Sequence, residues 1–158
     1  MNTRLVSLSL LVLVLSVPGC AVAPTPPPTL EDTSFFLARY DNVWEKSLKV
    51  LEREGLPVKE ADKATGLIIT KFVNYSVGMR AHQEIEDIAE RPDIRLALFT
   101  QVGYSLSIRI APAGDMSSQV TITSRIEAYD KNATQKWHPC RSRNVVERKM
   151  LEKIRAVL

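Results

Sequence analysis

Two stretches of alternating apolar and polar residues constrain the fold of this chain more than any other feature. Apolar side chains occupy almost every second position from Val102 to Ile110, and again from Val120 to Ala128. A period of two is typical of a strand that buries one face. The segment 111–118 between the stretches contains Pro, Gly and Asp and is typical of a turn. We therefore expect an antiparallel hairpin with one apolar face and one polar face.

Weaker patterns on both sides of this hairpin predict the remaining elements. A strand entering a helix is expected at 34–40, and a helix with Val43, Trp44, Leu48 and Leu51 on its buried stripe is expected to end at Gly55. Asp41 or Asn42 could cap this helix. Further strands are expected at 56–60 and 66–72, and further helices at 79–91 and from about residue 142 to the end.

The element order β-α-β-β-(α)-β-β-α indicates an α+β fold. Pro57 places the strand at 56–60 on an edge of the sheet, because proline cannot donate a hydrogen bond to a neighbouring strand. We expect one antiparallel sheet with the helices packed on one face and a polar opposite face.

The N-terminal segment has the pattern of a secretion signal that ends at a cysteine. Arg4 precedes an apolar core of about a dozen residues, which is too short to cross a bilayer. The sequence Leu15-Ser16-Val17-Pro18-Gly19-Cys20 then resembles the cleavage site of bacterial lipoproteins, although Pro18 departs from the small residue usual at its position.

This resemblance implies that residues 1–19 are removed and that Cys20 becomes a lipidated N-terminus carrying three acyl chains. Multiple chains anchor a protein stably in a bilayer. The resemblance also implies sorting to the outer membrane, because Ala21 stands where Asp would retain the protein in the inner membrane. No cofactor besides this covalent lipid is expected.

Residues 20–33 form a proline-rich tether between the anchor and a single domain at 34–158. The run AVAPTPPPTLEDT favours the polyproline II conformation, which would extend about 40 Å from the membrane. A proline-rich recognition motif is the alternative interpretation of this run.

Three motifs in the domain resemble the helix-grip domains of BamC-like (NlpB/DapX) outer-membrane lipoproteins. They are Asp41-Asn42-Val43-Trp44 with the leucines that follow it, the turn Asp62…Gly66-Leu67-Ile68, and the ending Trp137-His138-Pro139-Cys140-Arg141-Ser142…Glu147. Asn144 departs from the glycine that relatives often have. The resemblance implies a helix-grip-like fold in a periplasmic domain and a role in outer-membrane assembly or envelope maintenance.

Composition and motifs argue against nucleic-acid binding and catalysis. The net charge is only +3 at pH 7, without the dense basic stripe that nucleic-acid binding requires. His138 and Cys140 are two residues apart, but no third group orients them as a nucleophilic pair. These two residues also supply too few ligands for a zinc site, which needs three or four. We therefore expect a protein that is not an enzyme.

Other chemically suggestive residues have structural interpretations. We expect Cys140, Trp44 and Trp137 to pack in the core. The acidic residues of the segment 79–91 are expected on a solvated helix face rather than at a metal site; they are Glu84, Glu86, Asp87 and Glu90.

The expected function is that of a lipid-anchored adaptor that binds an envelope protein, and the alternative is a module that binds a lipid or another small apolar ligand. The candidate interaction face is the polar side of the hairpin, which carries hydroxyl groups and two arginines suited to carboxylate partners. Its residues are Ser105, Ser107, Arg109, Thr121, Thr123 and Arg125. The oligomeric state stays open.

Overall fold

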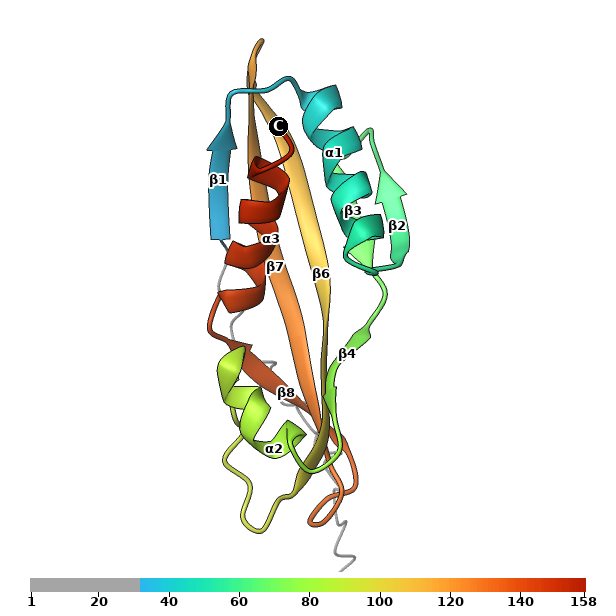
Figure 1. Ribbon diagram of the computed structural model, residues 1–158, viewed down its shortest axis with the longest axis vertical. Helices are drawn as coiled ribbons and strands as arrows, with labels where there is room; N and C mark the ends of the chain where they lie inside the picture. The colour runs from blue at the N-terminus through green and yellow to red at the C-terminus, as the bar shows by residue number, and fades with distance from the viewer. Residues whose placement is uncertain (1–31) are drawn as a thin grey trace, which may run out of the picture.

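The alternating stretches form the long central hairpin of the computed structural model, which describes residues 32–158 (Figure 1). Its strands are β6 (Phe99–Gly114) and β7 (Ser117–Asp130), both longer than the sequence pattern predicts. They pair antiparallel with Ile108 opposite Ile122 and Leu106 opposite Ser124. The predicted hairpin and its inward-facing residues are confirmed.

Shorter strands extend the hairpin on both sides into an antiparallel sheet of eight strands within the described region. On the β6 side lie β3 (Leu67–Thr70), β2 (Val58–Asp62) and β4 (Val73–Val77). On the β7 side lie β1 (Asp32–Phe36) and β8 (Trp137–Ser142), and β5 (Ala89–Glu90) pairs with β8. The edge position predicted for the strand near Pro57 is confirmed, because β2 pairs only with β3.

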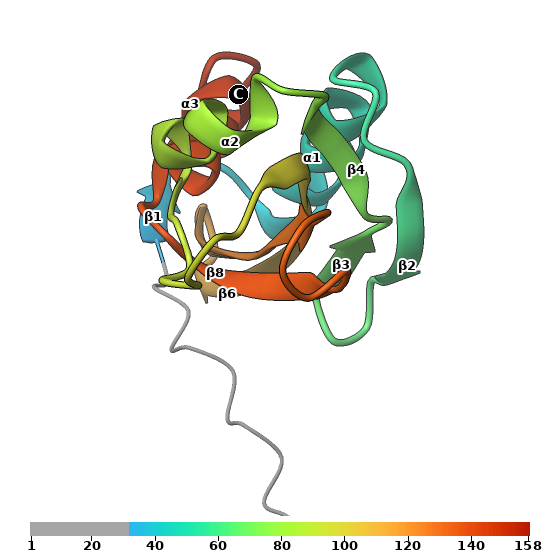
Figure 2. The ribbon, with the colours of Figure 1, turned by 90° about the horizontal axis from the view of Figure 1, so that it is seen from below.

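The helices α1 (Tyr40–Arg53), α2 (Ala81–Glu84) and α3 (Val145–Arg155) lie together on one face of the sheet (Figure 2). The opposite face of the central hairpin has no helix over it in the described part of the chain. The α+β class, with helices on one face of an antiparallel sheet, is therefore confirmed. We call the helix-covered face the inner face and the other the outer face.

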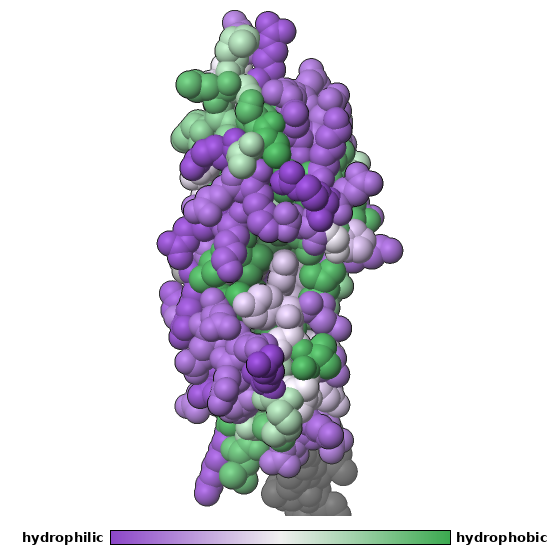
Figure 3. All heavy atoms as spheres, in the orientation of Figure 1, coloured by the Kyte–Doolittle hydropathy of each residue, from purple (hydrophilic) through white to green (hydrophobic). Residues whose placement is uncertain are grey.

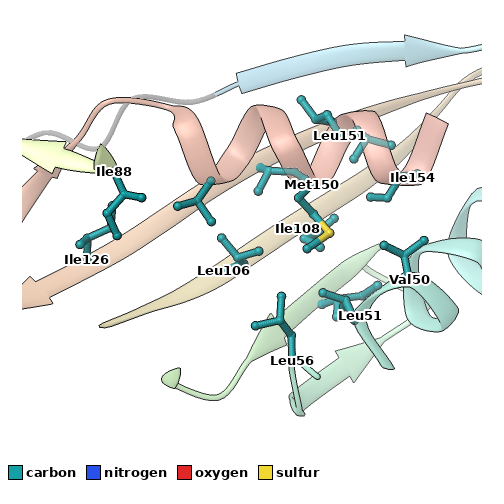
Figure 4. Close-up of a cluster of buried hydrophobic side chains, with 14 of the residues drawn as sticks. Val50, Leu51, Leu56, Ile88, Leu106, Ile108, Ile126, Met150, Leu151 and Ile154 are labelled. Atoms are coloured by element: carbon teal, nitrogen blue, oxygen red, sulfur yellow. The ribbon is translucent and has the colours of Figure 1, made fainter. Parts of the chain in front are cut away.

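The core lies between the inner face and the helices α1 and α3 (Figure 4). Met150 and Ile154 of α3 point toward Ile108 of β6, and Val50 and Leu51 of α1 approach from the other side. These side chains are almost completely buried. Because α1 and α3 are too short to be stable alone in water, this packing holds them in place.

The predicted helix over 79–91 is wrong. The chain forms only α2 and the 3-10 turn η1 (Ile85–Asp87) before it enters β5. Ala89 pairs with Ser142, and Arg143 N–H donates to the carbonyl of Ile88. Pairing with β8 therefore ends the helical segment after about two turns. The strands β4, β5 and β8 were not predicted, because short segments carry too little periodicity.

The starts of two other elements differ from the predictions. Strand β1 spans Asp32–Phe36, so it starts two residues before the strand expected at 34–40. Helix α1 begins after Arg39 without a side-chain cap, so neither Asp41 nor Asn42 caps it. It ends before Gly55, as predicted, and this glycine has φ +67°, the left-handed conformation common after a helix.

The motif Asp62…Gly66 forms a tight turn between β2 and β3. The carboxylate of Asp62 accepts hydrogen bonds from the hydroxyl of Thr65 and the N–H of Ala64, both at 2.9 Å, and these bonds hold its pKa below the ordinary value. Gly66 has φ +70°, and a Cβ there would collide with the carbonyl oxygen of Ile110. Only glycine fits this position without strain.

Candidate functional site

The six residues of the predicted interaction face lie together on the outer face of the sheet. The hairpin register makes them three cross-strand pairs, so they form one continuous surface. These pairs are Ser105 with Arg125, Ser107 with Thr123, and Arg109 with Thr121. The arginines are exposed and the hydroxyl residues are half-buried. We call this surface the polar face.

The two arginines of the polar face have different electrostatic surroundings. Arg125 forms an ion pair with Glu127 on the same strand, at 2.6 Å, which offsets its charge. Arg109 has no carboxylate partner in residues 32–158 and lies opposite Leu67 of β3 and Thr121 of β7. Arg109 is therefore the arginine whose charge remains available to a partner.

Beside the polar face, toward the Tyr129 end of β7, three aromatic side chains form a cluster that the sequence pattern did not predict. The ring of Trp137 lies 5.4 Å from that of Phe72 and 5.6 Å from that of Tyr129, measured between centroids, with interplanar angles of 82° and 57°. Trp137 is 40% exposed and Phe72 is 39% exposed. We call Phe72, Tyr129 and Trp137 the aromatic patch.

The expected core position is confirmed for Trp44, which is 5% exposed, and is wrong for Trp137. Trp137 faces outward because it pairs with Tyr129, an outward position of β7. One sequence signal could have indicated an aromatic ring on the outer face. It is Gly103, which leaves a gap in the row of outward side chains of β6. A Cβ on Gly103 would lie 2.6 Å from Cε1 of Phe72, so glycine makes room for this ring.

The thiol of Cys140 and the imidazole of His138 lie on the inner face, but each is hydrogen-bonded to a different partner and not to the other. Cys140 Sγ is 3.6 Å from the carbonyl oxygen of His138, whereas His138 Nε2 lies 2.5 Å from Thr134 Oγ1. Burial, together with the negative charge of Glu127, raises the pKa of Cys140 to about 12. A nucleophilic thiol needs a lowered pKa, so this environment disfavours attack by Cys140.

We expect Cys140 to resist thiol reagents while the domain is folded. At pH 8 the raised pKa leaves few thiolates, so labelling by a disulfide reagent should be on the order of a thousandfold slower than in urea-unfolded protein. Timed labelling of the Cys20→Ser chain, in which Cys140 is the remaining thiol, measures both rates. Similar rates in the two states would show an accessible, reactive cysteine.

The motif Ser142…Glu147 is a buried hydrogen-bond network that attaches α3 to the sheet. The hydroxyls of Ser124 and Ser142 donate to Oε1 of Glu147 at 2.5 and 2.7 Å. Oε2 of this fully buried residue has no partner within the described structure. Asn144 precedes α3 with φ +59°, which explains why glycine or asparagine suits this position.

A groove on the inner face is the place where an apolar ligand could bind between helices and sheet. It is lined by Tyr75 and Tyr104 of the sheet, Met150 of α3 and Glu54 after α1, and its volume is about 100 Å³. Figure 3 shows green and pale side chains in a furrow between hydrophilic helix surfaces. Pockets for drug-sized ligands usually have about 300–1,000 Å³. The core side chains thus leave little room for a ligand.

Two of the four acidic residues of the 79–91 segment form ion pairs with arginines. Glu86 pairs with Arg91 at 3.3 Å, and Glu90 with Arg141 at 3.9 Å. Within residues 32–158, no three His, Cys, Asp or Glu side chains come together as metal ligands would.

No helix within residues 32–158 combines the length and apolarity needed to span a bilayer. The predicted signal segment and the predicted lipidation residue Cys20 lie outside the described residues.

Comparison with known proteins gives no family for this chain. No family model and no curated protein matches its sequence. A DUF4468 family protein from Bacteroides ovatus is 11% identical with a TM-score of 0.38; the match covers 73% of this chain but only 63% of that one. A conserved protein from Geobacillus kaustophilus is 15% identical with the same TM-score, and the match covers 80% of this chain and 92% of that one. Similarities this low assign neither family nor activity.

Proposed function

We propose that this protein is a lipid-anchored adaptor of the bacterial outer membrane, with a BamC-like, helix-grip-like domain that faces the periplasm and binds another envelope protein. The anchor is Cys20 and residues 20–31 connect it to the domain. The proposal rests on the signal pattern together with an outer sheet face that is broad and lies away from the helices.

The polar face is the observation that carries the adaptor role. Its hydroxyl groups and Arg109 form one continuous surface, and arginine at a surface suits protein partners with carboxylate side chains. The alternative role, binding of a lipid or small apolar ligand, has weaker support because the groove between helices and sheet is small.

Reversing the charge of Arg109 tests the polar face. We expect Arg109→Glu to weaken recovery of the acidic partner from cross-linked envelopes by about tenfold at low salt, with a smaller effect at high salt. The free energy of unfolding should change by less than about 0.5 kcal/mol, because Arg109 is exposed. Quantitative mass spectrometry of the cross-linked products and urea unfolding provide the two measurements.

Lys49→Glu is the matched control, since it reverses an exposed charge on α1, on the helical side of the molecule. It should leave the cross-linked partners unchanged. Equal recovery with Arg109→Glu and Lys49→Glu would show that the polar face is only solvated surface. Recovery of no envelope protein by the parent chain would contradict the adaptor role itself.

A further inference from the structure

The aromatic patch has the shape and chemistry of a surface that binds a proline-rich segment. Trp137 is inclined to both neighbouring rings and packs against them, so the patch presents ring faces and ring edges to solvent instead of a flat stack. Beside Tyr129 the surface continues into a hollow of about 460 Å³ lined by Val77, Met79 and Lys131. The patch lies on the outer face, where no described helix covers it.

Surfaces lined by exposed aromatic rings are the usual binding surface for polyproline II segments. Proline rings pack on the aromatic side chains, and such a segment loses little conformational entropy on binding because it is already extended. Its backbone carbonyls make no internal hydrogen bonds, and Trp and Tyr carry donors at the tips of their rings. This chain contains one such segment, Pro24-Thr25-Pro26-Pro27-Pro28.

The position of β1 brings this segment within reach of the aromatic patch. Asp32 lies opposite Ile122, and β1 runs antiparallel to β7, so the N-terminal end of β1 points along β7 toward Tyr129. Tyr129 is seven residues from Ile122, or about 23 Å along the strand. At about 3.1 Å per residue, Pro28 can lie about 12 Å from Asp32 and Pro24 about 25 Å from it.

Strand β8 prevents these residues from continuing as an extension of β1. It pairs with β7 from Ile126 to Tyr129, which is the edge that an extended β1 would need. The inner side of this end is occupied by α2, η1 and β5. A segment that follows β7 toward Tyr129 therefore passes over the outer face, where the aromatic patch lies.

We propose that the proline-rich run at residues 24–28 of this chain binds the aromatic patch of the same molecule, with Pro24 at the level of Tyr129 and the prolines that follow crossing the outer face toward β1. The proline-rich run then acts as an attachment that orients the domain, rather than as a free spacer. With Pro24 held at the patch, Cys20 lies within about 12 Å of that end of the sheet. This inference does not depend on the adaptor role, because it concerns contacts within one chain.

Acrylamide quenching of tryptophan fluorescence tests the contact in residues 20–158 carrying Cys20→Ser. The chain has two tryptophans; Trp44 is buried and adds a small background, which the Trp137→Phe variant measures. Replacing the four prolines at 24, 26, 27 and 28 by serine keeps the length and should raise the quenching constant of Trp137 by about twofold. Thr25→Ser with Thr29→Ser is the control, and should leave quenching unchanged.

Three outcomes would overturn the inference. Equal quenching in the parent and the proline variant would show that the segment does not cover Trp137. An equal rise in the threonine control would show that prolines are not required. Protection of Trp137 that increases with protein concentration would show that a second copy of the chain covers the patch instead.

Discussion

Replacing Glu147 by alanine is expected to lower the free energy of unfolding by about 3 kcal/mol. The change leaves the hydroxyls of Ser124 and Ser142 without their common acceptor in the core. It also leaves a cavity beneath α3 and detaches this helix from β7 and β8. Because small domains have only about 5–15 kcal/mol of stability, the loss would be visible directly in urea unfolding followed by circular dichroism.

Two further variants separate the network from general effects on α3. Glu147→Gln keeps an acceptor for both serines and should cost about 1 kcal/mol, less than the alanine variant. Glu152→Ala removes an exposed glutamate from the same helix and should change stability by less than about 0.5 kcal/mol. If Glu147→Ala were as mild as Glu152→Ala, the network would not be what attaches α3.

Cys20→Ser is expected to remove the protein from the outer-membrane fraction. Without the thiol no diacylglycerol can be attached, and each acyl methylene contributes about 0.8 kcal/mol to membrane binding. Fractionation of cells followed by immunoblotting should find an uncleaved or soluble product where the parent sediments with the outer membrane.

Cys140→Ala is the matched control for this experiment. It removes the other cysteine, which is buried in the domain and lies far along the chain from the cleavage-site sequence that precedes Cys20. The control should sediment like the parent. Sedimentation of the Cys20→Ser protein with the outer membrane would contradict the lipoprotein interpretation, whatever the domain binds.

The sequence by itself determined the features that depend on local periodicity and on single special residues. The alternation around Ile108 and Ile122 is long enough to define both strands, their inner face and their pairing. Gly55 marked the end of α1, because a residue after a helix often needs a positive φ. The six residues of the polar face followed from the same alternation, because hairpin pairing places alternate residues on one surface.

Tertiary structure alone decided the rest, because the deciding contacts join segments far apart in the chain. The 79–91 segment has a helical pattern, but pairing of Ala89 with Ser142 converts its end into a strand. The sequence predicts a core position for Trp137 because its side chain is large and apolar. The register of β8 against β7 instead turns this side chain outward, beside Phe72 and Tyr129. Likewise Glu147 is an ordinary helical glutamate until the packing of α3 buries it against serines from two strands. Local preferences of about 1 kcal/mol per residue are overridden wherever such long-range pairing and burial contribute more.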